Sequence, residues 1–176
     1  MRSFAPHRLG RYECDAWVCY YRHEWAAFLR ASVAMVHEGF GMPAHRTVQG
    51  AYLVLRANML WAPYPDNDAA GAEQTMRRFY ALVESVHHLG LDPVEAARRE
   101  VAWWRGHREL QHRADGAAAD AEDLGKGADE LADALAGLYA YVYSADPDAV
   151  RPAGRRASGR RHGLLRPVGP PGLRPG

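Results

Sequence analysis

Two Glu-x-x-His pairs are the residues whose type and spacing could most directly do chemistry. They are Glu84 with His87, and Glu109 with His112. In di-iron helical bundles, such pairs on two helices hold the metals together with a Glu from each of two further helices. That arrangement does not fit here, because both pairs lie near the C-terminal ends of consecutive expected helices. A short connection makes such helices antiparallel, which places the two pairs at opposite ends of a bundle.

Antiparallel order also brings other histidines to one end of the bundle. His37 ends one expected helix, His45 begins the next, and Glu84 and His87 end the one after. Neutral imidazoles and carboxylates suit zinc or a first-row transition metal, and an open position could activate water. We therefore take these four residues as candidate metal ligands. On the simpler interpretation, the histidines are exposed near helix C-termini, where the helix dipole favours cations, and no cofactor is expected.

Arg56 lies in an expected helix that is apolar over most of its surface. One face of this helix carries residues at helical spacing, namely Val48, Tyr52, Leu55 and Met59. We expect this helix to be the most enclosed of the chain. A buried guanidinium needs a partner because an unpaired buried charge is very costly. Glu24 or Glu100 are the candidate partners in a core ion pair, and an anion or substrate anchor is the alternative.

The loop around Asp66 and Asp68 places several hydrogen-bond acceptors beside Trp61 and Tyr64. Further polar residues are expected at the same end of the bundle, namely His107, Glu109 and His112. The loop turns the chain and can cap the following helix, and it could also line the mouth of a polar pocket. No Gly-rich phosphate loop, Gly-x-Ser-x-Gly elbow, Cys-x-x-Cys or His-Glu-x-x-His motif occurs in the sequence.

Three stop-and-start signals determine the elements that must position these residues, at 39–43, 62–66 and 89–95. Each joins a Gly or Pro stop to a cap-like start, and Asp92-Pro93-Val94-Glu95 is the clearest. The expected helices cover residues 15–38, 43–61, 69–89, 92–113 and, after a linker at 116–127, 128–144. We predict an all-α fold, an up-and-down bundle of four helices plus a fifth C-terminal helix, as a single domain over residues 1–150.

Residues 151–176 differ in composition, with seven Arg, many Pro and Gly, and no acidic residue. Too little of this segment is apolar to bury, so we expect a disordered basic tail. It could bind the phosphate backbone of a nucleic acid non-specifically. Alternatively, it is GC-rich DNA translated out of frame, because such codons specify Arg, Pro, Gly and Ala.

The remaining composition points to a reduced compartment. Cys14 and Cys19 would point away from each other on a helix, so no disulfide is expected. No leader sequence is recognisable, and no apolar run reaches the roughly 18 residues of a membrane-spanning helix. We therefore expect a cytoplasmic protein that does not enter the membrane.

Several runs of the sequence carry a family resemblance. They are Ala51–Asn58, Trp61–Asp68, Met76–Tyr80 and Trp103–Arg105. Together they resemble an uncharacterised family of actinobacterial proteins, over about residues 11–150. The resemblance implies no activity, because none is known for the family.

Three functional hypotheses follow, and none decides whether the protein is an enzyme. The first is a non-enzymatic interaction or assembly module, with a protein partner or a homo-oligomer. It rests on the absence of a catalytic set and on surplus aromatic residues, since Trp103-Trp104 and Tyr20-Tyr21 each place one ring off the core stripe. The second is a helical-bundle metalloprotein or metalloenzyme, and the third is nucleic-acid binding through the tail.

Overall fold

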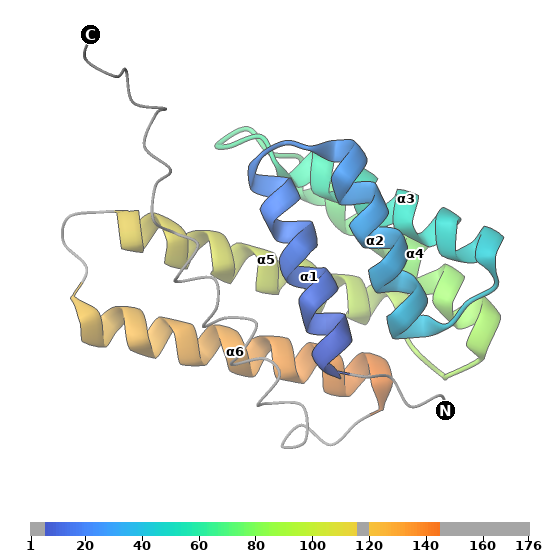
Figure 1. The fold of residues 1–176 in the computed structure, drawn as a ribbon. Coiled ribbons are helices and arrows are strands. Elements are labelled where there is room, and N and C mark those ends of the chain that lie inside the picture. Colours follow the sequence, from blue (N-terminus) through green and yellow to red (C-terminus); the bar gives the residue numbers. More distant parts are fainter. Residues whose placement is uncertain (1–5, 116–119, 145–176) are drawn as a thin grey trace, which may run out of the picture.

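The protein is all-helical in the residues that the computed structural model describes, which are 6–115 and 120–144 (Figure 1). This confirms the all-α prediction. The described part contains six helices: α1 Pro6–Tyr21, α2 Trp25–Phe40, α3 Ala44–Trp61, α4 Ala69–His87, α5 Pro93–Asp115 and α6 Ala121–Tyr143. The basic tail at 151–176 and the expected domain boundary at residue 150 lie outside the described residues.

The single helix expected over residues 15–38 is wrong, because this segment forms parts of α1 and α2. The break is at His23, whose φ of 55° is in the left-handed region. The N–H of His23 donates to the carbonyl of Tyr20 and the N–H of Glu24 to that of Cys19, which closes a tight turn. No Gly or Pro marks this turn, and the apolar spacing continues across it. The sequence pattern of α1 and α2 therefore predicts a single helix, although the two helices pack side by side (Figure 1).

The linker expected over residues 116–127 is also wrong in its second half, because α6 begins at Ala121. Asp120 caps this helix, and its carboxylate accepts the N–H of Asp123 at 2.8 Å. A capping Asp followed by acidic residues in the first turn stabilises a helix start even where Gly residues follow. Residues 116–119 lie outside the described part. The bounds of α3, α4 and α5 match the expected helices within two residues.

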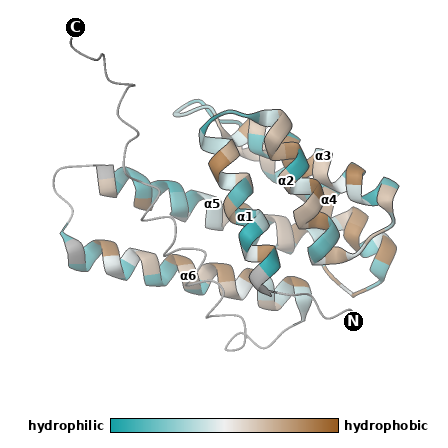
Figure 2. Cartoon of the chain, viewed as in Figure 1, coloured by the Kyte–Doolittle hydropathy of each residue, from teal (hydrophilic) through white to brown (hydrophobic). Residues whose placement is uncertain are grey.

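Helices that follow each other in the chain pack against each other (Figure 1). The helices α5 and α6 form a long antiparallel pair, and the bundle of α1 to α4 lies along it. Hydrophilic and hydrophobic residues alternate around the helices, as amphipathic packing requires (Figure 2). The most completely buried large side chains come from four helices: Val36, Val83, Val101, Leu135 and Leu138. None of the helices in the described residues is long and apolar enough to cross a membrane.

The helix α3 packs through its small residues, which reverses the face that we expected to be buried. Ala51 and Ala57 are fully buried, whereas Val48 and Tyr52 are exposed by 54% and 58%. A Cβ added at Gly50 would lie 3.2 Å from side-chain atoms of Met42 and Phe79. Small side chains allow neighbouring helices to approach closely at this face, which also buries Val54 and Trp61, and Val48 and Tyr52 face outward.

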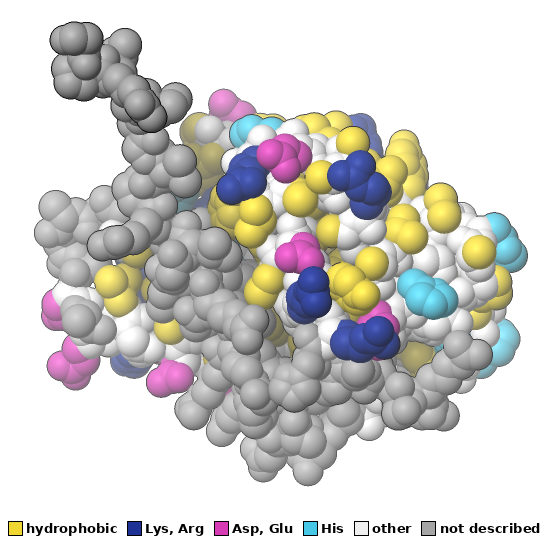
Figure 3. All heavy atoms as spheres, in the orientation of Figure 1, with side chains coloured by type: hydrophobic (Ala, Val, Ile, Leu, Met, Phe, Trp, Pro, Cys, Tyr) yellow, Lys and Arg dark blue, Asp and Glu magenta, His cyan; other side chains and the backbone are white. Residues whose placement is uncertain are grey.

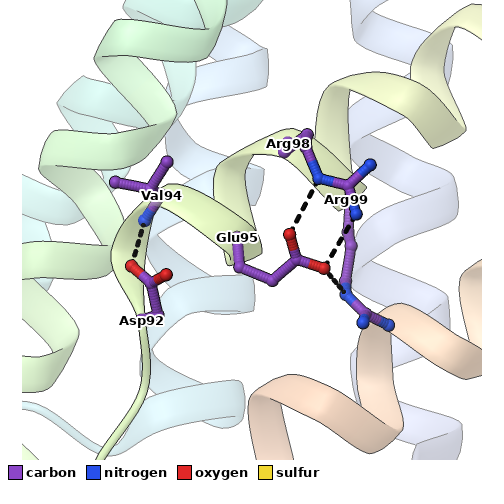
Figure 4. A network of polar contacts seen from close by, with 5 residues as sticks. All are labelled: Asp92, Val94, Glu95, Arg98 and Arg99. Atoms are coloured by element: carbon purple, nitrogen blue, oxygen red, sulfur yellow. Dashed lines mark hydrogen bonds and ion pairs between the residues drawn. The ribbon is translucent and has the colours of Figure 1, made fainter.

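The start of α5 carries the clearest local signal of the sequence, and its capping Asp behaves as expected (Figure 4). The carboxylate of Asp92 accepts the N–H of Val94 at 2.9 Å. Glu95 does not reach back to complete a capping box. Its carboxylate instead accepts N–H groups from Arg98 at 2.8 Å and Arg99 at 2.7 Å. The two guanidinium groups lower the pKa of Glu95 to about 2.

On the face in Figure 3, charged side chains of both signs are interspersed with hydrophobic ones.

This ion-pair network predicts an unusually acidic titration of Glu95. In the parent protein its carboxylate should titrate near pH 2, and in the double variant Arg98→Gln, Arg99→Gln the midpoint should rise toward the ordinary 4.5. Because the folded-state pKa is depressed, the stabilisation that it brings is present above the unfolded-state pKa and is lost as the pH falls toward 2. Side-chain carboxyl NMR measures both midpoints. A parent midpoint near 4.5 would contradict the network.

Candidate functional site

A cavity of about 90 Å³ lies where the helices converge, and we call it the inner chamber. All six helices contribute to its wall. Its polar groups come from Glu13, Asn58, Tyr80, Glu100, Trp103, Trp104, Tyr139 and Tyr143, and most of the remaining lining residues are aromatic or aliphatic. For comparison, an engineered apolar cavity of roughly 150 Å³ admits benzene. The inner chamber is smaller than that cavity, so it has room only for a group of a few non-hydrogen atoms.

Two carboxylates face this space from helices that are distant in sequence. Glu13 on α1 is only 7% exposed, and its Oε2 accepts a hydrogen bond from the hydroxyl of Tyr139 on α6 at 2.5 Å. Glu100 on α5 accepts the hydroxyl of Tyr80 on α4 at 2.8 Å and the indole N–H of Trp104 at 3.0 Å. These neutral donors satisfy carboxylate oxygens that burial would otherwise leave without water.

The charge of the inner chamber is one-sided. Among the described residues that line it, two are acidic and none is Lys, Arg or His. The described wall of the inner chamber thus combines two carboxylates with apolar surface.

Three tyrosines share this space and remain neutral. Burial raises the pKa of Tyr80 and Tyr139 well above the ordinary 10.0, and the charge of Glu100 or Glu13 beside each hydroxyl raises it further. The pKa of Tyr143 is also raised, by burial and then by the same two carboxylates. Because the charges of Glu13 and Glu100 both raise the pKa values of these tyrosines, the two glutamates and the three tyrosines form one electrostatic cluster. Within it, the hydroxyl of Tyr80 donates to Glu100 and that of Tyr139 donates to Glu13.

Aromatic rings form much of the wall and hold one another in place. The ring centroids of Trp17 and Trp103 are 5.6 Å apart in an edge-to-face arrangement. Phe40 lies 5.5 Å from both Phe79 and Tyr143. Such pairs add to the stability of the core beyond the apolar area that they bury. Their faces carry negative electrostatic potential, so the wall and the carboxylates favour the same kind of guest, a cation.

The four residues predicted as metal ligands are not brought together as a ligand set. In the described part of the chain, no group of three or more His, Cys, Asp and Glu side chains is placed to hold a metal ion. His37 and His45 are exposed, and His37 and His87 occupy the last turns of α2 and α4, where the dipole interpretation expected histidines near helix ends.

Glu84 instead organises the connection between α4 and α5. Its carboxylate accepts the backbone N–H groups of Leu89, Gly90 and Leu91 at 3.0, 3.1 and 3.0 Å. Desolvation alone would raise the pKa of Glu84, but these three N–H donors together outweigh it and lower the pKa. Both oxygens are therefore engaged in holding the turn in which Gly90 adopts a φ of 72°.

The predicted core ion pair of Arg56 with Glu24 or Glu100 is wrong. Arg56 and Glu24 are both exposed, because α3 presents its small residues to the core and Glu24 lies in the turn before α2. Glu100 is correctly placed toward the interior, but Tyr80 and Trp104 are its hydrogen-bond partners. The residue most clearly missed is Glu13. It could have been found, because it lies at helical spacing between the buried Leu9 and Trp17.

Comparisons with family models, with curated proteins and with solved structures give no match for this chain. The arrangement of the inner chamber is thus the basis for a functional proposal, and the actinobacterial resemblance stays an expectation.

The buried tyrosines predict a loss of stability in alkali. Their folded-state pKa values lie above 10.0, whereas the phenols of the unfolded chain ionise near that value. The free energy of unfolding should therefore fall as the pH rises above about 10. Urea unfolding followed by circular dichroism between about pH 9 and pH 11 measures this slope.

The variant Tyr139→Phe should show a shallower decrease, because it removes one of the raised groups. Tyr52→Phe, at an exposed position on α3, is the matched control and should behave like the parent. An equally steep decrease in the Tyr139→Phe variant would show that this hydroxyl is not held neutral by its surroundings.

Proposed function

We propose that this protein binds a small organic cation, an alkylammonium ion, in the inner chamber. The observation that carries the proposal is the pair of carboxylates, Glu13 and Glu100, in a chamber with aromatic walls. A binding site is expected where an apolar cavity presents a few convergent polar groups and titratable residues with perturbed pKa values.

The chemistry of the wall selects the charge of the guest. An ammonium group within hydrogen-bond reach of a carboxylate gains a charge-assisted hydrogen bond, and an aromatic face attracts the same charge. An anion would meet the two carboxylates of the described wall and would be repelled by them. A neutral guest would gain apolar burial but no charge-assisted hydrogen bond.

The size of the space limits the guest to a short or branched alkyl chain. About 90 Å³ is smaller than a cavity that takes benzene, so the ammonium should carry only a few carbon atoms. The tyrosine hydroxyls support binding more than proton transfer, since their raised pKa values keep them protonated near neutral pH.

A pair of ligands with the same shape and different charge tests this proposal. Calorimetry should detect saturable binding of ethylammonium, and ethanol should bind at least about tenfold more weakly. In Glu100→Gln the affinity for ethylammonium should fall about tenfold or more, because a hydrogen bond to a charged group contributes roughly 1.5–3 kcal/mol. Glu109→Gln, on the exposed face of the same helix, should bind like the parent. Equal affinities for the two ligands would refute the proposal.

Self-association through the outer face of α3 is a second candidate function, and it extends the interaction-module hypothesis. Val48, Tyr52 and Met59 are exposed on this helix. Exposed hydrophobic side chains that gather on one element often mark a protein-binding surface. A second copy of the chain could cover them by pairing the two α3 helices about a twofold axis, the commonest symmetry of soluble oligomers.

Light scattering after size-exclusion chromatography tests this candidate. The parent protein should be a dimer at micromolar concentration, and Tyr52→Glu should be a monomer because the new charge would be buried in the interface. Tyr64→Glu places the same charge at an exposed position in the loop after α3, outside the Val48, Tyr52 and Met59 face, and should leave the dimer intact. A monomeric parent would exclude self-association at that concentration.

The remaining hypotheses are kept as proposals with narrower support. A cytoplasmic location is supported by Cys14 and Cys19, which form no disulfide in the described residues. Nucleic-acid binding through residues 151–176 rests on the composition of that segment alone. A metal site at His37, His45, Glu84 and His87 lacks geometric support among the described residues.

A further inference from the structure

A second pocket, of about 350 Å³, lies beside the inner chamber, and we call it the outer pocket. Its wall comes from the end of α1, the turn at His23, the end of α3 with the loop that follows, and the second half of α5. The sequence placed Trp61, Tyr64 and His112 at a pocket mouth, and all three line this pocket. Asp66 and Asp68 do not line it.

The outer pocket has the opposite charge character to the inner chamber. No Asp or Glu occurs among the described residues that line it, whereas Arg108 and three histidines do. Its other lining side chains are mainly aromatic. Two adjacent sites in one small protein therefore present opposite charges to a guest.

Arg108 is the fixed cation of the outer pocket. Its Nη2 donates to the carbonyl of Trp61 at 2.7 Å and to the hydroxyl of Tyr20 at 3.0 Å. Its guanidinium carbon lies 4.4 Å from the ring centroid of Trp61 and 5.5 Å from that of Tyr64. These contacts hold the guanidinium plane against two aromatic rings.

The other terminal nitrogen of Arg108 is unsatisfied. Nη1 is buried and has no hydrogen-bond acceptor among the described residues. A buried donor on a cation is costly to leave without an acceptor, and neither Trp61 nor Tyr20 offers its acceptor to this nitrogen. An anionic group bound in the pocket, which Arg108 lines, would balance the charge of this guanidinium.

Flat rings surround this cation. His107 stacks on Trp17 with centroids 5.2 Å apart, and the ring of His112 lies 4.3 Å from that of Tyr64. Tyr64 is 62% exposed on the loop after α3, so a ligand can reach its ring from solvent. Rings of this kind stack on a planar guest and contribute contact area with little loss of conformational entropy.

We infer that the outer pocket binds a planar aromatic carboxylate, with its carboxylate at Arg108 and its ring against the aromatic side chains of the pocket. The inference does not depend on the proposed function of the inner chamber, because Arg108, Trp61 and Tyr64 do not line that chamber. Benzoate is a suitable probe, and benzamide is its uncharged counterpart of the same shape.

Calorimetry and tryptophan fluorescence on the full chain test the inference. Benzoate should bind saturably and change the emission of the tryptophans in the wall. Benzamide and acetate should each bind at least about tenfold more weakly, since one lacks the charge and the other lacks the ring. Equal affinities for benzoate and benzamide, or no saturable binding of benzoate, would overturn the inference.

Variants on one helix locate the site. Arg108→Gln should weaken benzoate binding about tenfold or more, whereas Arg105→Gln, exposed on the same helix, should not change it. Because Arg108 also hydrogen-bonds to Trp61 and Tyr20, its replacement could disturb the fold. Tyr64→Ala is therefore a second variant, at an exposed position, and it should weaken benzoate binding without loss of fold. Benzoate binding that survives both Arg108→Gln and Tyr64→Ala would refute this location.

Discussion

The placement of two carboxylates among aromatic rings is the constraint on which the rest of this structure depends. Glu13 on α1 is buried and Glu100 on α5 is half-buried, so both need hydrogen-bond donors from the protein. Tyrosine hydroxyls on α4 and α6 and an indole on α5 supply them. Because hydrogen bonds in a low-dielectric interior are costly to leave unmade, these contacts fix how four helices sit relative to one another.

The small-residue face of α3 is the second determinant of the arrangement. Gly50, Ala51 and Ala57 let this helix approach α2 and α4 closely. The same close approach turns Val48 and Tyr52 toward solvent, so the packing of the core and the character of the surface have one cause. An apolar helix face in a sequence is therefore not always the buried one, since a face of small residues can pack more tightly.

The sequence was sufficient for the fold class and for most helix bounds, because Gly, Pro and capping Asp residues mark those positions physically. It was not sufficient at His23, where a non-glycine residue adopts a left-handed conformation and the apolar spacing runs on. The missed turn also hid the register of α1 and with it the inward position of Glu13. Glu100 and the loop of Trp61 and Tyr64 were identified, but their partners depend on contacts between distant segments that no local pattern encodes.

Trp104 belongs to the walls of both cavities. Its indole N–H donates to Glu100 in the inner chamber, while its ring lies 6.0 Å from that of Trp61 in the outer pocket. Together with Trp17, which also lines both cavities, it forms the partition between two compartments of opposite charge. Any occupant that tilts this partition alters the neighbouring compartment, and thermodynamic linkage requires the influence to be equal in both directions.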